Sequence, residues 1–207
     1  MTVTKITELS KSKVQITTDE GFAFVLYKGE LRFYKLAEGQ EVAEDIFREI
    51  TEQLLPKRAK LRAMNLLKVR PYTVRQLTDK LKQGGYPEEI VETAISYVES
   101  FGYLNDKRYA MDYVECYKES KSKAQIKNAL IQKGITKHII EDCIEEIYAE
   151  STVDIEKEQI LAWIKKKNFR PSEATFEEKQ KFCAFLYRKG FQIDTIRSVL
   201  SLDITSI

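Results

Sequence analysis

A helix-start signal and a helix-end signal recur as a pair three times along this chain. Each start has Thr or Ser followed three residues later by Gln or Glu, the pattern of a capping box, and the starts lie at Thr73, Ser122 and Thr175. Each end has a glycine followed by an apolar residue, which is typical of a left-handed helix cap, at Gly85, Gly134 and Gly190. The paired signals predict three equivalent helices, and they constrain the fold more than any other feature.

Each of these helices is flanked by two further amphipathic stripes. The stripes before them lie at 59–67, 109–117 and 160–164, and those after them at 90–98, 139–147 and 196–200. The sequence therefore predicts a mainly α fold with three tandem three-helix units, at 57–106, 107–150 and 151–207, in an elongated curved array. The alternative is one compact all-α domain whose segments share only the ordinary signals of helix ends.

The first 56 residues have a different pattern. Short β-type runs at 13–17, 22–27 and 31–36 are separated by turn-like sequences, and a further strand around 3–9 fits the same pattern. A small antiparallel meander of this kind needs a covering element, because a two- or three-stranded sheet is marginally stable alone. The helical stripe at 42–54 can supply that cover, and we expect Pro56 to end it. We therefore expect residues 1–56 to form a β-meander plus a helix.

Cysteine and histidine usage excludes the common metal sites. The 207-residue chain has three cysteines and one histidine, too few for a usual structural zinc site with about four nitrogen or sulfur ligands. Cys143 lies in an apolar stripe and His138 in the first turn of a predicted helix, so we expect a buried thiol and a solvated imidazole. The motifs of phosphate loops, metalloproteases and nucleophile elbows are absent. We expect no cofactor and no catalysis, although a Ser–Lys or carboxylate-only site stays open.

The sequence shows no sign of a membrane-spanning segment or a secretory signal. No apolar run approaches the roughly 18 residues of a membrane span, and the first residues lack the apolar segment of a secretory signal. We therefore expect a cytoplasmic protein without a membrane partner.

The charge is nearly balanced overall but separated along the chain. The chain has 34 basic and 32 acidic side chains. Between Lys57 and Lys82, nine bases are opposed by Asp79 alone, whereas eight carboxylates between Glu141 and Glu158 are opposed by one lysine. Such a stripe is the footprint of a phosphate-rich or acidic partner. The alternative is a solvated face that the neighbouring acidic helix balances.

At this point the residues resemble a known family, the RecX regulators of the RecA recombinase. The signature is Gly-Tyr-Leu-Asn-Asp-Lys-Arg-Tyr-Ala at 102–110. It is accompanied by the three helices that run from a capping box to a glycine, the last of which ends in Phe-Leu-Tyr-Arg-Lys-Gly-Phe at 185–191. The resemblance covers roughly residues 57–200, and the β-rich front is similar to the extension of Gram-positive members. Within the signature, we expect Asn105 or Asp106 to cap a helix and Tyr103 and Leu104 to be core contacts.

The resemblance implies a non-catalytic regulator of the SOS response, DNA repair and recombination that binds RecA–DNA filaments. It implies suppression of recombinase, ATPase and coprotease activity, with single- or double-stranded DNA bound weakly or through the filament. Our candidate binding residues are the outward bases, and we expect Arg75 and Lys82 to share one face and Lys123 and Lys127 a similar one. The full set is Lys57, Arg58, Arg62, Lys68, Arg70, Arg75, Lys82, Lys121, Lys123, Lys127, Lys165, Lys166 and Lys167.

One alternative of a different class remains open. A helix-turn-helix regulator of duplex DNA would place polar base-readers such as Arg75 and Gln76 at the start of a recognition helix. Nothing in the chain marks a dimerisation element, however, and such regulators usually bind paired half-sites. We therefore expect a monomer that follows an extended polyanion.

Overall fold

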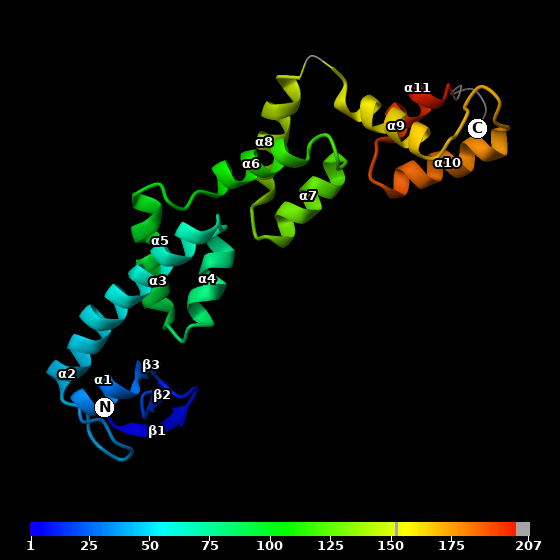
Figure 1. The fold of residues 1–207 in the computed structure, drawn as a ribbon. Coiled ribbons are helices and arrows are strands. Elements are labelled where there is room, and N and C mark those ends of the chain that lie inside the picture. The colour runs from blue at the N-terminus through cyan, green and yellow to red at the C-terminus, as the bar shows by residue number, and fades with distance from the viewer. Residues whose placement is uncertain (152, 202–207) are drawn as a thin grey trace. The chain divides into compact units, whose positions relative to one another are not determined.

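The chain folds into two compact units, Met1–Asn105 and Asp106–Ile207. The structure, a computed structural model, describes residues 1–151 and 153–201, so the last residues of the expected third helical unit lie outside the described residues. The first unit holds the β-rich front and one helical triplet, and the second holds two helical triplets (Figure 1).

The β-rich front is a three-stranded antiparallel sheet in the order β1-β2-β3. The strands are β1 (Val3–Glu8), β2 (Lys13–Thr18) and β3 (Ala23–Tyr27). In the central strand β2, Ile16 pairs with Ile6 on one side and Phe24 on the other. Val14, Ile16 and Thr18 are buried while the residues between them are half-buried, so one face of the sheet packs against the core. The expected meander is therefore confirmed.

The prediction of a strand at 31–36 is wrong. The chain instead forms a short helix, α1 (Lys28–Phe33), whose Glu30 carboxylate accepts a hydrogen bond from the Tyr27 backbone N–H at 2.8 Å. The helix ends because Lys35 adopts a left-handed conformation (φ 51°), and the Leu36 N–H then donates to the Leu31 carbonyl. A glycine is the usual sign of such an end, and its absence made the segment look like a strand.

The helix that covers the sheet does not end at Pro56. It comprises α2 (Glu44–Arg48), a π-helical segment η1 (Glu49–Leu54) and α3 (Leu55–Val69), with Pro56 in the first turn of α3. Proline cannot donate the usual backbone hydrogen bond, and its ring crowds the preceding turn. The wider π turn immediately before it accommodates both effects. The Phe47 ring on α2 meets the Phe22 ring edge-to-face, 5.6 Å away, so the expected cover is present.

Three helical triplets follow as the sequence predicts. The first is α3, α4 (Val74–Lys82) and α5 (Glu88–Ser100). The second is α6 (Asp106–Tyr117), α7 (Lys123–Gln132) and α8 (Lys137–Ala149). The third is α9 (Ile155–Lys166), α10 (Phe176–Arg188) and α11 (Ile193–Leu200). The middle helices α4, α7 and α10 each begin with a complete capping box and end at a glycine with φ between 82° and 92°.

Each triplet buries its own apolar stripes. The first triplet shares one core with the sheet, and this core includes Phe24, Ile50, Leu77 and Leu81. The second and third triplets have separate cores, centred on Leu130 and Leu186 respectively. The alternative of one compact globule with no internal recurrence is therefore wrong.

The expected burial of individual residues is mostly confirmed. Cys143 is buried and His138 is exposed. Within the signature, Leu104 is buried, but Tyr103 is 54 % exposed, so its assignment as a core contact is wrong. Its ring stacks on Phe101, at 5.9 Å between centroids, because Gly102 turns the chain (φ 68°) and places both rings at the surface.

Candidate binding surface

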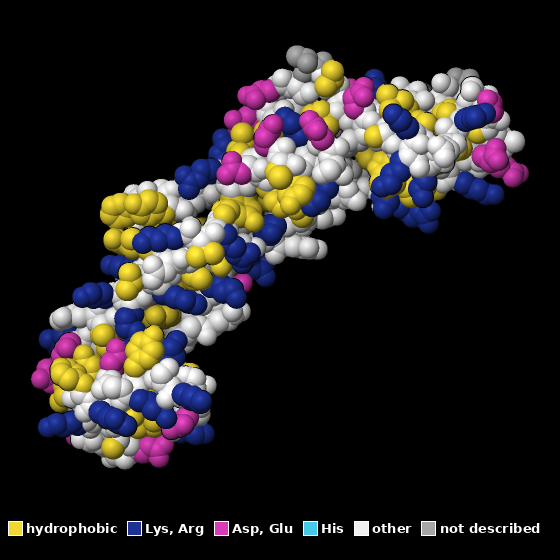
Figure 2. All heavy atoms as spheres, in the orientation of Figure 1, with side chains coloured by type: hydrophobic (Ala, Val, Ile, Leu, Met, Phe, Trp, Pro, Cys, Tyr) yellow, Lys and Arg dark blue, Asp and Glu magenta, His cyan; other side chains and the backbone are white. Residues whose placement is uncertain are grey.

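Basic side chains gather on α3 and α4 of the first triplet. In Figure 2, dark blue side chains are spread among yellow and white ones over the region of α3–α5 with few magenta ones between them, whereas magenta gathers over α8. Four of the candidate bases here are exposed and, among residues 1–151 and 153–201, have no ion pair or ring contact: Lys57, Arg62, Lys68 and Arg75. These four charges are therefore available to a partner.

The other candidates of the first triplet contact the protein itself. Arg58 pairs with Glu30 of α1 at 2.9 Å and lies over the Tyr27 ring at 4.5 Å, with only 17 % of its side chain exposed. Lys82 pairs with Glu88 at 2.6 Å, and Arg70 lies over the Tyr72 ring at 4.4 Å. Arg58 therefore links the β-rich front to α3 and does not present a free charge.

Tyr86 marks the side of α3 on which Arg58 and Arg62 lie. Burial raises the pKa of the Tyr86 hydroxyl, and the two guanidinium groups partly oppose that rise. Lys60 instead lies over the Tyr97 ring of α5 at 4.9 Å. The bases of α3 thus lie on two sides of the helix, some near Tyr86 and one over Tyr97, and do not form a single row.

In the second triplet the candidate lysines lie half-buried against neighbouring elements. Lys121 donates to the Tyr113 hydroxyl at 3.0 Å and lies 3.7 Å from the centre of the Tyr117 ring. Lys123 lies over the Tyr148 ring at 4.4 Å, and Lys127 forms an ion pair with Glu141. The expectation that Lys123 and Lys127 project outward like Arg75 is therefore wrong, because both contact α8.

The ion pair between Lys127 and Glu141 changes the acidity of the Glu141 carboxylate. The Lys127 ammonium, by hydrogen bond and by charge, holds the pKa of Glu141 below its usual value. The acidic helix α8 therefore neutralises part of the basic helix α7, as the alternative reading of the charge pattern anticipated for this triplet.

In the third triplet the three consecutive candidate lysines end α9 and begin the loop after it. Lys165 is exposed, Lys166 lies over the Trp163 ring at 4.9 Å, and Lys167 lies over the Phe185 ring at 5.5 Å. The structure thus brings two of the three candidates onto one aromatic pair.

Two further lysines, which were not among the candidates from the sequence, also lie over aromatic rings. Lys133 lies over the Tyr109 and Tyr113 rings, and Lys189 over the Trp163 and Phe185 rings. Both immediately precede the glycine that ends the middle helix of their triplet. The available signal was the i, i+4 spacing of Tyr109, Tyr113 and Tyr117, which reads equally well as a core stripe.

Buried polar contacts fix the third triplet against the start of α7. The Gln159 amide nitrogen donates to the carbonyls of Lys118 and Lys121, at 2.6 and 2.9 Å. The Ser122 hydroxyl donates to the Lys189 carbonyl at 2.7 Å. These hydrogen bonds join α9 and the end of α10 to the segment that leads into α7.

The Tyr148 hydroxyl leads to a stability prediction. None of the described residues accepts or donates a hydrogen bond to this buried oxygen. Replacing Tyr148 with Phe removes an unsatisfied group and leaves the ring under Lys123. Because an unpaired buried polar group costs free energy, we expect Tyr148→Phe to match the wild type at neutral pH or exceed it by up to about 1 kcal/mol in free energy of unfolding.

The same substitution should remove a pH dependence. Burial, with a smaller contribution from the Glu156 carboxylate, raises the pKa of Tyr148 to about 12. The folded state therefore favours the neutral phenol, and this stabilisation is complete below about pH 10 and lost as the pH rises through 12. Urea unfolding between pH 9 and about pH 11.5 should show a steeper loss in the wild type than in the variant. Parallel curves would contradict the assignment.

The part of the chain that the structure describes offers neither a membrane-spanning helix nor a cluster of metal ligands. None of the helices formed by residues 1–151 and 153–201 combines the length and apolarity that a membrane crossing requires. Within the same ranges, His, Cys, Asp and Glu side chains do not gather in threes as a metal site would need.

Comparison with known proteins gives the family. Family models match all three triplets: the first three-helix domain of RecX at 59–97, the second at 105–144 and the third at 154–200. The regulatory protein RecX of Caldanaerobacter subterraneus subsp. tengcongensis is 33 % identical over 205 residues, which cover 98 % of this chain and 100 % of that protein. The chain belongs to the RecX family.

Further RecX proteins agree with this assignment. The regulatory protein RecX of Clostridium botulinum strain Alaska E43 is 32 % identical over 95 % of this chain and 94 % of its own. A crystal structure of regulatory protein RecX has the same fold, with a TM-score of 0.64 at 24 % identity over 97 % of this chain and 98 % of that one. The RecX crystal structure from Lactobacillus salivarius gives a TM-score of 0.63 at 26 % identity, over 71 % of this chain and 95 % of that one.

Proposed function

We propose that this RecX-family chain is a non-catalytic regulator that binds RecA–DNA filaments and lowers their recombinase, ATPase and coprotease activity. The observation that carries the proposal is the set of exposed bases on α3 and α4 without an ion pair among the described residues, namely Lys57, Arg62, Lys68 and Arg75. Family membership and the sequence resemblance to RecA regulators supply the partner.

The regulation follows from binding alone. A nucleoprotein filament presents phosphates and protein carboxylates along its length, and the exposed bases of the first triplet can pair with such groups. Occupying that surface restrains the filament without any bond being made or broken by the regulator. The chain acts as a monomer in the cytoplasm, and its functional parts are 1–56, 57–106, 107–150 and 151–207.

Charge reversal on the first triplet tests the proposal. We expect the Lys57→Glu, Lys68→Glu, Arg75→Glu triple variant to need at least about tenfold more protein for half-maximal inhibition of DNA-dependent ATP hydrolysis by RecA, because a few lost phosphate contacts outweigh 1.4 kcal/mol. Inhibition by the wild type should also weaken as the salt concentration rises, since neutralised phosphates release their counterions.

A matched variant separates this effect from net charge. Lys5→Glu, Lys11→Glu, Arg32→Glu changes the total charge by the same amount on exposed residues of the β-rich front. It should inhibit like the wild type, with helical content unchanged in both variants by circular dichroism. Equal inhibition by the α3–α4 variant and the wild type would show that this surface is not the binding face.

A mobility-shift assay tests the alternative that the chain is a regulator that binds duplex DNA directly. Tight, sequence-selective binding of a duplex in a mobility-shift assay without RecA would favour a helix-turn-helix regulator over filament binding.

A further inference from the structure

An aromatic pair in the third triplet is surrounded by ammonium groups. The rings of Trp163 on α9 and Phe185 on α10 meet edge-to-face, with 5.3 Å between centroids. Lys166 and Lys189 lie 4.9 and 5.3 Å from the Trp163 ring, and Lys167 and Lys189 lie 5.5 and 5.8 Å from the Phe185 ring. Three like charges around two rings repel one another, so the arrangement favours the approach of an anion.

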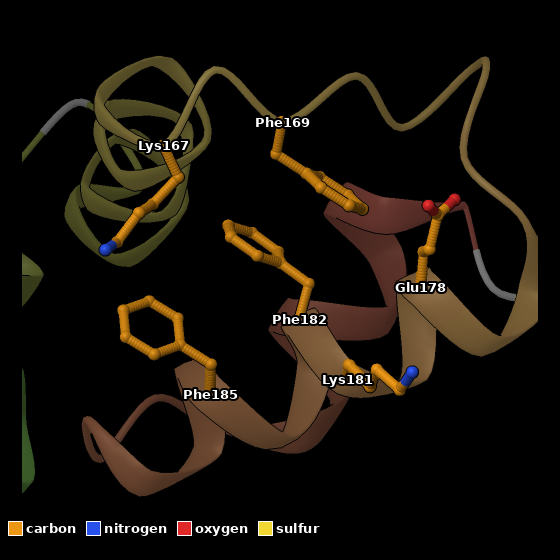
Figure 3. Close-up of a pocket in the computed structure, with 6 residues that line it drawn as sticks. All are labelled: Lys167, Phe169, Glu178, Lys181, Phe182 and Phe185. Carbon is orange, nitrogen blue, oxygen red and sulfur yellow. The ribbon is translucent and has the colours of Figure 1, made fainter.

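A cavity of about 360 Å³ opens beside this pair. Its lining is Lys167, Phe169, Glu178, Lys181, Phe182 and Phe185. Figure 3 shows Lys167 and Phe185 on one side of Phe182, with Glu178 and Lys181 on the other side. The Glu178 carboxylate is already bound to the Thr175 backbone N–H at 2.9 Å and to its hydroxyl at 3.1 Å, which lowers its pKa. The Lys167 end of the cavity is therefore apolar with a positive rim.

The aromatic wall of the cavity is built by the local backbone. Asn168 takes a left-handed conformation (φ 49°) directly after α9, and the Phe169 N–H closes the helix end by donating to Ile164. This turn lays the Phe169 ring flat against Phe182, with centroids 4.2 Å apart and planes 7° apart. The stacked rings are held in place before any ligand arrives, so binding orders few side chains.

We propose that this cavity takes an unpaired nucleotide of single-stranded DNA. The base stacks against Phe185 at the Lys167 end, and the adjoining phosphates lie on Lys166, Lys167 and Lys189. Aromatic rings beside lysines are the usual elements of single-strand recognition, because every base offers a π face and every linkage a negative charge. The proposal rests on the proposed function for the presence of DNA in the target, and it adds a single-strand contact on the third triplet to the basic surface of the first.

The lining also predicts how selective the site is. Apart from Glu178, which is engaged by Thr175, the other five lining side chains offer only rings and ammonium groups. Base edges are distinguished by directional hydrogen bonds from amides, hydroxyls and guanidinium groups. Affinity should therefore depend on the presence of a base and change little with its identity.

The single tryptophan of the chain reports on this site directly. We would titrate the full chain with an oligothymidylate of about 12 nucleotides, which fits the site sizes of single-strand binders, and follow Trp163 fluorescence at low salt. We expect saturable quenching. Lys166→Gln, Lys167→Gln, Lys189→Gln should weaken binding at least about tenfold and reduce the slope of log affinity against log salt by roughly 2, at about 0.7 for each lost phosphate contact.

The ring is tested separately from the charges. Phe185→Leu keeps an apolar side chain of similar reach but removes the stacking face. It should weaken oligothymidylate binding by about fivefold to a hundredfold, the range for loss of one base stack. Tyr187→Leu is the matched control, since Tyr187 is 63 % exposed on the same helix and does not line the cavity. Lys5→Gln, Lys11→Gln, Lys137→Gln is the matched control for charge, and both controls should bind like the wild type.

Two ligands decide between base stacking and other kinds of binding. An abasic oligomer of equal length carries the same phosphates, and equal affinity for it would overturn the base pocket. An acidic peptide containing a single phenylalanine represents a protein partner, and displacement of the oligothymidylate by it at lower concentration would likewise overturn the proposal. Absence of quenching by oligothymidylate in a folded wild-type protein would do the same.

The design keeps this inference apart from the proposed function. Inhibition of RecA ATP hydrolysis is measured on the same preparations. If the wild type binds oligothymidylate as expected but has no effect on RecA, the proposed function fails and the nucleotide site stands. If the wild type inhibits RecA but does not bind oligothymidylate, the nucleotide site fails and the proposed function stands.

Discussion

Gly85→Ala should destabilise the first unit by about 2–5 kcal/mol, the sum of a left-handed backbone penalty and overpacking. Gly85 ends α4 with φ +82°, and an added Cβ would overlap the Val25 Cγ2 and lie 3.0 Å from the Val25 Cβ. Val25 is buried on β3, so neither side can withdraw into solvent. The free energy of unfolding in urea, followed by far-ultraviolet circular dichroism, measures the loss.

Two further variants identify the cause. Gly39→Ala imposes the same kind of backbone strain, with φ +77°, but its added Cβ meets open space, so it should cost only about 1–2 kcal/mol. Val25→Ala in the Gly85→Ala background removes the overlapping methyl groups. The double variant should therefore lose about 0.5–3 kcal/mol less unfolding free energy than the sum of the losses of the two single variants. Strictly additive losses would show that the contact between β3 and the end of α4 contributes little.

Leu81→Ala should cost about 2–5 kcal/mol of unfolding free energy, because deleting a fully buried leucine leaves a cavity. Leu81 is 0 % exposed in the core that the sheet and the first triplet share. Ile144 lies in the apolar stripe of α8 but is half-buried, so Ile144→Ala should cost less than Leu81→Ala. Urea unfolding curves of the two variants against the wild type measure the difference.

The matched surface variant is Leu61→Ala on α3. Leu61 is 57 % exposed, and substitutions at such positions usually stay within about 0.5 kcal/mol of the wild type. Equal losses for Leu81→Ala and Leu61→Ala would contradict the shared core.

These two predictions concern the same feature, the integration of the β-rich front with the first triplet. Arg58 pairs with Glu30 across them, Gly85 packs on Val25, and one apolar core runs through both. A comparable glycine contact joins the third triplet to the second, where a Cβ on Gly190 would lie 2.7 Å from Ser122 Oγ and 2.8 Å from Ala124 Cβ. The front and the first triplet thus share a core as well as a close glycine contact, whereas the second and third triplets share a close glycine contact but have separate cores.

Local signals were predictable because they depend on a few adjacent residues. The capping boxes at Thr73, Ser122 and Thr175 follow from side chains within one turn of their helix. The segment at 31–36 was mispredicted because its helix end is formed by Lys35, a residue type with no preference for that conformation. Pro56 was mispredicted because a π turn, which has no sequence signature, accommodates it.

The candidate site was predictable in composition but not in geometry. Clusters of lysine and arginine are visible in the sequence, and Lys57, Lys68 and Arg75 are indeed exposed and without an ion pair among the described residues. Whether a given base is free depends on residues far along the chain, such as Glu30 for Arg58 and Glu141 for Lys127. Long flexible side chains bind whichever partner the fold brings near, and spacing alone does not name that partner.

The amino-acid sequence by itself determined the number of helical triplets, the ends of their middle helices and the separation of charge, because hydrogen bonds within a turn and apolar periodicity act over a few residues. Only the tertiary structure decided which lysines pair with carboxylates, which lie on aromatic rings, and that Phe169, Phe182 and Phe185 line one cavity. Those outcomes depend on tertiary packing, which brings together residues that lie far apart in the sequence.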